Sequence, residues 1–492
     1  MHSKRNQQGL CCSRADRRVF LADCGMGFTG LVLGSLLGRD AEAASLDAWA
    51  PPDGKPHFAP KAKRVIWLFM LGGVSHLESF DPKPGLTPYA GKKIGDSPFR
   101  DALKAQFVKD NVRGNLAAHP IDLAIYPMQC GSKKFGQSGT EVADWFPNIG
   151  ERMDDIAVIR SMWTTNNDHG AILQFHTGRH AFDGFFPTIG SWIHYGLGSL
   201  NQNLPSFVVL GEPPGDCCGG TGTHGSDYLG PEHAGVYLEI NPDHPLPFVS
   251  PANDVYLEEQ KREFEFIDKL NKMEVVEYPT DAALRARIKS YELAFRMQMA
   301  VPEAVQFKEE SRETRQMYGL DDEATKSFGE TCLAARRLSE RGVRFVQIYH
   351  GGAGNAWDAH KDVKKNHSEL AAKVDRPIAG LMRDLKQRGM LDDTIVVWAT
   401  EFGRTPGAQG GNGRDHHPFG FSVWMAGGGI KGGIVHGKTD DLGFNAIENR
   451  HYVTDIHATL LHQLGLDPYR LDIPGRKRLE IDHGKPITEI LS

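Results

Sequence analysis

The stretch Thr394–Gly433, TIVVWATEFGRTPGAQGGNGRDHHPFGFSVWMAGGGIKGG, reads as strand, loop and strand. Residues 394–399 are apolar and β-branched without polar alternation, which predicts a strand buried on both faces, as in a parallel sheet. Residues 421–426 predict a second buried strand. Glu401 directly follows the first strand, and His416-His417 precede the second. Ligands bind beyond the carboxyl ends of such strands, so the loop is a candidate metal site. The alternative is that Glu401 caps a loop and the histidines are surface residues.

Outside this stretch, buried strands alternate with helical patterns. Further strands are predicted at 64–70, 156–162, 206–210 and 343–350. Helices are predicted at 141–154, from 171 to 179, and at 284–299, 324–338, 368–388 and 452–464, the last capped around Thr454 or Asp455. Residues 85–140 predict a long decorated loop. The pattern indicates an α/β fold: a doubly wound, mainly parallel sheet with helices on both faces, whose carboxyl edge is the functional edge.

Composition excludes several classes of protein. The chain has 492 residues, 24% of them charged, and a formal net charge of -6, which does not favour a nucleic-acid partner. Three of its seven cysteines lie before residue 25, and the other four are too scattered for a disulfide scaffold. The adjacent Cys217 and Cys218 are interpreted as ordinary thiols or as one incidental disulfide.

The N-terminus has the layout of a twin-arginine export signal. Arg17-Arg18 precede a glycine-rich, weakly apolar stretch and an Ala-x-Ala-like region, which predicts a signal peptide over residues 1–44. About 15 mildly apolar residues are too few to span a bilayer, and no later segment is long and apolar enough. Residues 45–62 predict a linker, and 63–492 a single domain with insertions around 85–140 and 212–330. The expected location is the periplasm or cell envelope of a bacterium.

Ligand-type side chains follow several predicted strands. Asp358 and His360 come after the strand 343–350, and His76 comes after the strand 64–70. With Glu401 and the pair His416-His417, they form a candidate set for a divalent metal, since carboxylate and imidazole suit zinc, manganese or iron. A bridging carboxylate could serve two ions.

Nucleotide binding is rejected at the one glycine-rich motif. Residues 427–432 formally match G-x-G-x-x-G after a strand, but the dinucleotide site needs a helix to begin there. The following residues 433–437 predict loop and strand instead. The sequence also lacks a nucleophile elbow and a Walker loop.

The ordered motifs resemble one bacterial family, the domain of unknown function 1501. They are Gly72–Pro84, His176–Arg179, Thr400–Pro406, Gly413–Pro418, Thr439–Phe444 and His457–Leu461. The resemblance covers essentially the whole chain after the leader. It implies the alkaline phosphatase-like fold that sulfatases and phosphomutases share. It also implies two metal sites and a nucleophile at a helix N-terminus.

The metal residues of the superfamily correspond only partly to this chain. Glu401 lies where the superfamily has an acid followed by His or Asn, and Phe402 replaces the second member. His416 or His417 matches the later lone histidine. Asp358 and His360 resemble the other acid-plus-His pair at a tighter spacing. For the metal-binding Asp after the first strand, the nearest candidates are His76 and Asp81.

The nucleophile position departs further from the superfamily pattern. It falls on Asp168-His169, where no Ser, Thr or Cys stands. Thr164 or Thr165 could substitute only if the loop differs. The resemblance therefore implies either direct attack by water activated at a metal, or a site that only binds.

The sequence thus predicts an exported, metal-dependent hydrolase of phosphate or sulfate esters. Zinc is the first expectation for the metal, with manganese, calcium or iron as alternatives. Arg179 or Arg404 would clamp the anion of a small ester or a sulfated glycan. The alternative is a non-catalytic protein that binds sulfated glycans or cell-surface partners on a degenerate scaffold. A purely structural envelope protein is a third reading. The substrate, the metal and the oligomeric state stay open.

Overall fold

A computed structural model describes residues 54–111, 121–240, 301–473, 475–476 and 478–492, with isolated residues between 262 and 297. The continuous ranges belong to one compact unit, residues 46–246 and 290–492. The predicted leader, the first part of the linker and most of the helix predicted at 284–299 lie outside the described residues. The end of the linker is ordered, because the backbone N–H groups of Lys61 and Ala62 donate to Gln463 at 2.8 and 2.9 Å.

The centre of this unit is a nine-stranded sheet in the order β12-β4-β11-β8-β1-β7-β5-β6, with β15 also paired to β4. The strands are β1 (Arg64–Met70), β4 (Ile156–Trp163), β5 (Phe207–Leu210), β6 (Val236–Leu238), β7 (Phe345–His350), β8 (Thr394–Ala399), β11 (Phe421–Ala426), β12 (Ile434–His436) and β15 (His451–Tyr452). All neighbours run parallel except β11, which is antiparallel to β4 and β8. This mixed α/β architecture confirms the predicted fold class.

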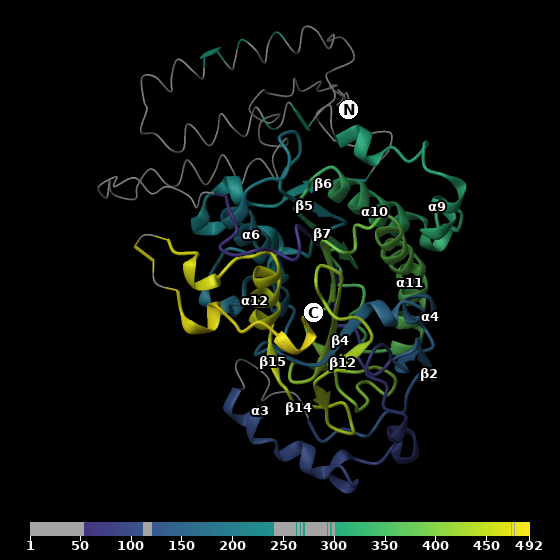
Figure 1. Ribbon diagram of the computed structural model, residues 1–492. Helices are drawn as coiled ribbons and strands as arrows, with labels where there is room; N and C mark the ends of the chain where they lie inside the picture. Colours follow the sequence, from purple (N-terminus) through teal and green to yellow (C-terminus); the bar gives the residue numbers. More distant parts are fainter. Residues whose placement is uncertain are drawn as a thin grey trace, which may run out of the picture. The chain divides into compact units, whose positions relative to one another are not determined.

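Helices cover both faces of the sheet, as Figure 1 shows. One layer contains α10 (Glu323–Glu340) and α11 (Val363–Gln387), with the short α4 (Pro147–Gly150). The other contains α5 (Ala171–Thr177), α6 (Ile189–Leu197) and α12 (Val453–Gln463). Among the described helices, none has the length and apolar character needed to cross a bilayer.

The two faces of β1 show why its sequence lacks polar alternation. Ile66, Leu68 and Met70 pack with α10 and α11, whereas Trp67 and Phe69 pack with α5 and α12. Successive side chains of a strand point to opposite faces, so a strand between two helical layers must be apolar at every position.

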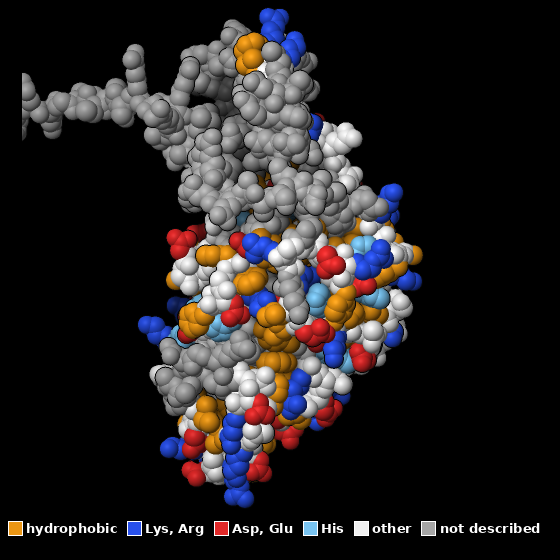
Figure 2. Space-filling view, turned by 90° about the vertical axis from the view of Figure 1, so that its left-hand side faces the viewer, with side chains coloured by type: hydrophobic (Ala, Val, Ile, Leu, Met, Phe, Trp, Pro, Cys, Tyr) orange, Lys and Arg blue, Asp and Glu red, His pale blue; other side chains and the backbone are white. Residues whose placement is uncertain are grey.

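Basic and acidic side chains are interspersed over the described part of the face in Figure 2.

Several predicted boundaries are wrong. Residues 141–154 do not form one helix: β3 (Thr140–Ala143) pairs with β2 (Ser132–Phe135), and α4 and a 3-10 turn at Met153–Asp155 follow. Pro147 can only begin a helix there, and α4 ends at Gly150. α11 begins at Val363 rather than 368. The expected cap of α12 is also absent, since its N-cap residue is Tyr452 and makes no side-chain cap.

The predicted loop 85–140 is more structured than expected. Its described part carries 3-10 turns and one short helix, namely Pro84–Tyr89, Ile94–Asp96, Arg100–Lys104 and α3 (Gln106–Asn111), and then β2. One small apolar cluster, which includes Leu86 and Ile94, packs the first two of these turns against Phe444.

Acid is expected to destabilise the fold through two buried histidines of the α5 and α12 layer. Burial lowers the pKa of His176 to about 3 and that of His457 to about 4. Both values lie below the unfolded value of about 6.5, so the folded state binds fewer protons. Stability is fully present above pH 6.5 and is lost as the pH falls towards 4. Each histidine should cost about 2 kcal/mol of unfolding free energy at pH 5.

Urea titrations at pH 7 and pH 5 measure this loss. His176→Met removes one titrating group and keeps a side chain of similar volume. The loss of unfolding free energy between pH 7 and pH 5 should therefore be smaller in this variant than in the wild type. An unchanged difference in a folded His176→Met protein would contradict this explanation.

Candidate metal centre

The candidate metal centre is built around the carboxylate of Asp358, in the loop after β7. Asp358 Oδ1 lies 3.0 Å from His360 Nε2 and 3.0 Å from His416 Nε2, and Arg404 Nη2 donates to it at 2.7 Å. Asp358 Oδ2 lies 3.2 Å from His169 Nε2. His169, Asp358 and His416 offer ligand atoms that all lie within 4.8 Å of one another. Three imidazoles from three separate segments thus converge on one acid.

The other nitrogen of each imidazole faces a hydrogen-bond acceptor. His169 Nδ1 lies 2.9 Å from Glu401 Oε1, and His416 Nδ1 lies 2.6 Å from the Asn167 carbonyl oxygen. His360 Nδ1 is hydrogen-bonded to Gln409 Oε1. A carbonyl oxygen only accepts, so Nδ1 of His416 carries the proton. Partners of this kind orient metal-binding histidines in proteins.

This tautomer leaves an acceptor facing an acceptor. Burial and the charge of Arg404 lower the pKa of His416 to about 3, so the ring is neutral at pH 7 with its lone pair on Nε2. That lone pair faces Asp358 Oδ1, which also only accepts. His169 Nε2 is buried and faces the other oxygen of the same carboxylate, Asp358 Oδ2, at 3.2 Å. A cation between these atoms would satisfy all of them, so the residues fit a divalent metal.

The charges of the centre are strongly coupled. Burial alone would raise the pKa of Asp358, but three imidazoles and Arg404 hold it far below its usual range. Burial alone would lower the pKa of His169, but the carboxylates of Asp358 and Glu401 outweigh it and raise the pKa to about 9. Asp358 and His360 are 26% and 38% exposed, whereas Glu401 is fully buried, so solvent reaches the centre from the side of His360.

Two glycines at the end of β1 allow this close packing. Gly72 and Gly73 have φ of 123° and 79°, in the region that favours glycine. A Cβ on Gly72 would lie 2.4 Å from the Asp358 backbone nitrogen, and one on Gly73 would lie 2.3 Å from the Phe402 ring. The backbone N–H of Gly72 donates to Glu401 Oε1 at 2.9 Å. The turn after β1 therefore supports the centre through its backbone.

Arg404 is part of the scaffold of the centre. It is fully buried, and its Nε and Nη1 donate to the carbonyls of Gly73 and Arg414 at 2.8 and 3.1 Å. Its Nη2 donates to Asp358. Burial lowers its pKa, and the neighbouring acids oppose that shift. A guanidinium committed in this way orients Asp358 rather than clamping a substrate.

The adjacent His416 and His417 point to opposite sides. Strands β9 (Gly403–Arg404) and β10 (His416–His417) pair as His416 with Arg404 and His417 with Gly403. Since side chains alternate across a strand, His416 faces Asp358 and His417 faces away. The His417 ring stacks on Phe444 at 4.2 Å, and burial lowers its pKa to about 3.

His76 lies on the side of His417, away from the centre. It is buried, with Nε2 2.6 Å from the Gly443 carbonyl oxygen. Burial lowers the pKa of His76. In the part of the chain that the structure describes, these two histidines do not belong to a group of three close ligands.

Of the residues predicted at the nucleophile position, only His169 faces the centre. Thr164 Oγ1 donates to Gln174 Oε1 at 2.8 Å, and Thr165 Oγ1 accepts from Gln174 Nε2 at 2.7 Å. Asp168 is exposed, and its backbone carbonyl accepts from Ala171. His169 therefore occupies the inner position of this loop, as a ligand-type side chain.

Arg179 lies at the other end of α5 from His169. Seven residues of helix separate the two ends by about 10 Å. Arg179 Nε pairs with Asp482 Oδ1 at 2.5 Å, and its guanidinium lies over the Phe186 ring. Arg179 therefore cannot clamp an anion bound at Asp358.

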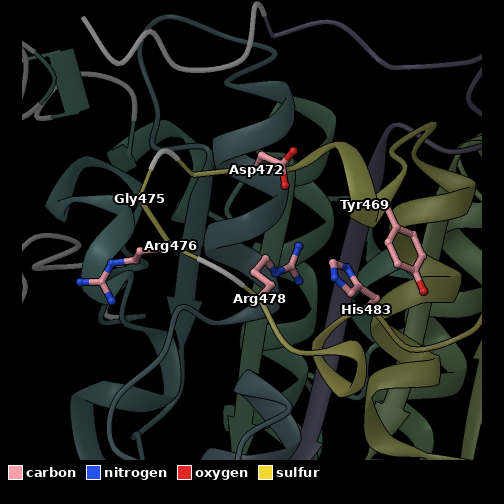
Figure 3. A pocket seen from close by; sticks show the side chains of 6 residues that line it. All are labelled: Tyr469, Asp472, Gly475, Arg476, Arg478 and His483. Atoms are coloured by element: carbon pink, nitrogen blue, oxygen red, sulfur yellow. The ribbon is translucent and has the colours of Figure 1, made fainter. Parts of the chain in front are cut away.

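A surface cavity of about 520 Å³ lies close to this pair. It is lined by Tyr469, Asp472, Gly475, Arg476, Arg478 and His483, which Figure 3 shows. Arg478 Nη2 donates to the Asp482 carbonyl at 3.1 Å, so the cavity adjoins Arg179 rather than the Asp358 centre.

Gln409 and Asn167, which orient His360 and His416, were not predicted from the sequence. The ion pair of Glu78 with Arg414 was not predicted either. Gln409 stands in a glycine-rich loop that has no periodic signal. Arg414 could have been noticed as a charged residue between glycines and the predicted ligands. Its guanidinium donates to Glu78 at 2.7 and 3.1 Å, and both side chains are fully buried.

Fold and site together define an α/β protein with a histidine–carboxylate centre at the carboxyl edge of its sheet. The chain belongs to the family described as Protein of unknown function (DUF1501), which matches residues 62–491. This confirms the resemblance seen in the sequence motifs. No curated protein matches the chain.

Solved structures give weaker likenesses. A protein in the alkaline phosphatase superfamily from Vibrio parahaemolyticus is 12% identical, with 95% of this chain and 79% of that chain covered and a TM-score of 0.38. The PsFucS1 sulfatase from Pseudoalteromonas sp. is 13% identical, with coverages of 86% and 73% and a TM-score of 0.32. The C-terminal periplasmic domain of EcEptC from Escherichia coli, in complex with Zn, is 9% identical, with coverages of 90% and 99% and a TM-score of 0.32. At these scores the family match alone carries the assignment.

Replacing Glu401 by glutamine is expected to weaken divalent-metal binding by about 10–100-fold while the protein stays folded. Glutamine can keep the acceptor for Gly72 and His169, but it removes the charge that makes the imidazole a stronger ligand. Competition with a chromogenic chelator measures the affinity. Glu448→Gln, a change at an exposed acid, is the control and should bind as the wild type does. Equal affinity of Glu401→Gln and wild type would contradict the orienting role.

Proposed function

We propose that the protein is a metal-dependent hydrolase of phosphate or sulfate esters. The observation that carries the proposal is the set of imidazoles around Asp358, each with Nδ1 on an acceptor and Nε2 turned to the carboxylate. His169, Asp358 and His416 would hold the cation, with His360 at the exposed side. Glu401 orients His169 and is not required as a ligand, whereas His76 and His417 lie outside the set.

A divalent cation, zinc in first place for this donor set, would supply Lewis-acid polarisation of an ester oxygen and a water of lowered pKa. The chain supplies the orientation. Arg404 fixes Asp358, and Asn167 fixes the tautomer of His416. The hydrogen bond to Asp358 raises the pKa of His360, whose ring lies on the exposed side of the centre. An imidazole on this side could serve as a general acid for a leaving oxygen.

The side chains favour direct displacement by water over a covalent intermediate. Thr164 and Thr165 are both committed to Gln174, and Asp168 points to solvent. A hydroxyl nucleophile would need a neighbouring base and a free approach to the ester. Small anionic esters and sulfated glycans are the proposed substrate classes.

A second function, binding without catalysis, has one observation in its favour. Arg404 is fully buried and donates to Asp358 and to backbone carbonyls, and Arg179 lies at the far end of α5. Neither arginine predicted to clamp an anion is therefore placed to bind an ester at Asp358. A scaffold that has lost its clamp could retain the metal and recognise a sulfated glycan or a cell-surface partner. Export through the twin-arginine route to the periplasm or cell envelope is proposed for either function.

The test is elemental analysis of the mature protein, purified without chelators, followed by a screen of aryl phosphates, phosphonates and sulfates. Asp358→Asn and His416→Gln should lose both metal and hydrolysis, and the control His462→Gln should keep both. Metal without hydrolysis would support the binding function. A folded wild-type protein that takes up no divalent metal even after incubation with Zn²⁺ would exclude the centre.

A further inference from the structure

We propose that His436 and His451 form a second transition-metal site, separate from the centre at Asp358. The Nε2 atoms of His436 and His451 lie 2.9 Å apart. His436 is the last residue of β12 and His451 is the first residue of β15, and both strands pair in parallel with β4. His436 lies opposite Ile159, and His451 lies opposite Met162. Backbone ladders therefore hold the two imidazoles together, which is the rigid placement that metal sites require.

The tautomer of His451 is fixed from behind. Its Nδ1 lies 3.0 Å from Asp455 Oδ2, and Asp455 Oδ1 accepts from the backbone N–H of Lys485 at 2.8 Å. A carboxylate accepts, so Nδ1 of His451 carries the proton and Nε2 presents a lone pair towards His436. A carboxylate behind an imidazole is the usual second partner of a metal-binding histidine.

The two imidazoles are partly accessible. His436 is 8% exposed, and the side chain of His451 is 14% exposed. Burial, and then the neighbouring His451, lower the pKa of His436, which favours its metal-binding form. Two imidazoles at this depth can both turn Nε2 to one ion, and water can fill its remaining positions.

Glu489 lies on the neighbouring 3-10 turn Thr488–Ile490, and its side chain is exposed. The donor set of the site is the two imidazoles, and water can complete the coordination of an ion. Such a set suits Zn²⁺, Ni²⁺ or Cu²⁺.

The site would tie two short strands together. β12 has three residues and β15 has two, and each strand pairs with β4. An ion held by His436 and His451 would join β12 to β15.

Calorimetric titration of the chelator-treated full-length mature protein with Zn²⁺ tests the proposal. His436→Ala and His451→Ala are each expected to bind one Zn²⁺ fewer than the wild type. Asp455→Asn should lower the affinity for that Zn²⁺ ion by about 10–100-fold. His462→Ala, also on α12, is the control and should match the wild type. Circular dichroism verifies that each variant is folded.

A second measurement removes the other centre. In an Asp358→Asn background, Zn²⁺ should still raise the Tm, and adding His436→Ala should abolish that rise. The proposal fails if folded His436→Ala binds as many ions as the wild type. It also fails if Zn²⁺ raises the Tm of Asp358→Asn and of Asp358→Asn/His436→Ala equally. In either case the two histidines share only a hydrogen bond. Neither outcome depends on ester hydrolysis, so failure here is distinct from failure of the proposed function.

Discussion

Replacing Asp358 by alanine is expected to abolish metal binding at the centre and to lower the unfolding free energy by about 3–5 kcal/mol. Arg404 is fully buried and would lose its carboxylate partner, while His169 would lose one of two acids that raise its pKa. Removing one partner of a buried ion pair leaves an uncompensated charge, which costs more than the pair gains. Urea titration and elemental analysis measure the two effects.

Asp392→Ala is the matched control, because Asp392 is exposed and lies outside the centre. It should retain the metal and change stability by less than about 0.5 kcal/mol. Metal retained at wild-type affinity in Asp358→Ala would show that Asp358 is not a ligand, even if stability falls.

Arg414→Met is expected to destabilise the protein by about 3–5 kcal/mol without touching any proposed ligand. Arg414 makes two hydrogen bonds to Glu78, and both side chains have no exposed surface. Its Nη1 and Nη2 also donate to the carbonyls of Thr405 and Pro127 at 3.1 Å each. The variant would leave the Glu78 charge buried and unpaired. Chemical denaturation measures the loss.

The double variant Glu78→Met/Arg414→Met sharpens the test. Replacing a buried ion pair by apolar side chains is often near neutral, so the double variant should be more stable than Arg414→Met alone. Arg414→Lys should not restore stability, because a lysine cannot make the two-pronged contact. Additive losses in the double variant would show that the pair is not coupled.

The sequence predicted those parts of the fold that local pattern determines. Apolar runs gave β1, β8 and β11 within a residue, because a strand between two helical layers has no polar position. Asp358 and Glu401 were predicted to meet, because parallel strands place their carboxyl ends at one edge. Helix boundaries were less accurate: α11 begins earlier than predicted, and α12 begins after Tyr452 without a side-chain cap.

The roles of individual side chains were not predictable from order along the chain. His416 and His417 are equivalent in sequence, and only the register of β10 against β9 turns one to Asp358 and the other away. Arg179 looked like an anion clamp, but the length of α5 carries it to Asp482. Gln409 acts through one contact made between loops, and no local pattern encodes such a contact.

The direction of β11 has an evolutionary consequence. Because β8 runs to the carboxyl edge and its neighbour β11 starts from that edge, residues 400–420 make one excursion without a crossover helix. That single excursion carries Glu401, Arg404 and His416. Relatives could therefore lengthen it, shorten it or exchange its polar residues while the strand order stayed intact. The polar groups of the candidate metal centre could therefore change by drift in one segment of a constant scaffold.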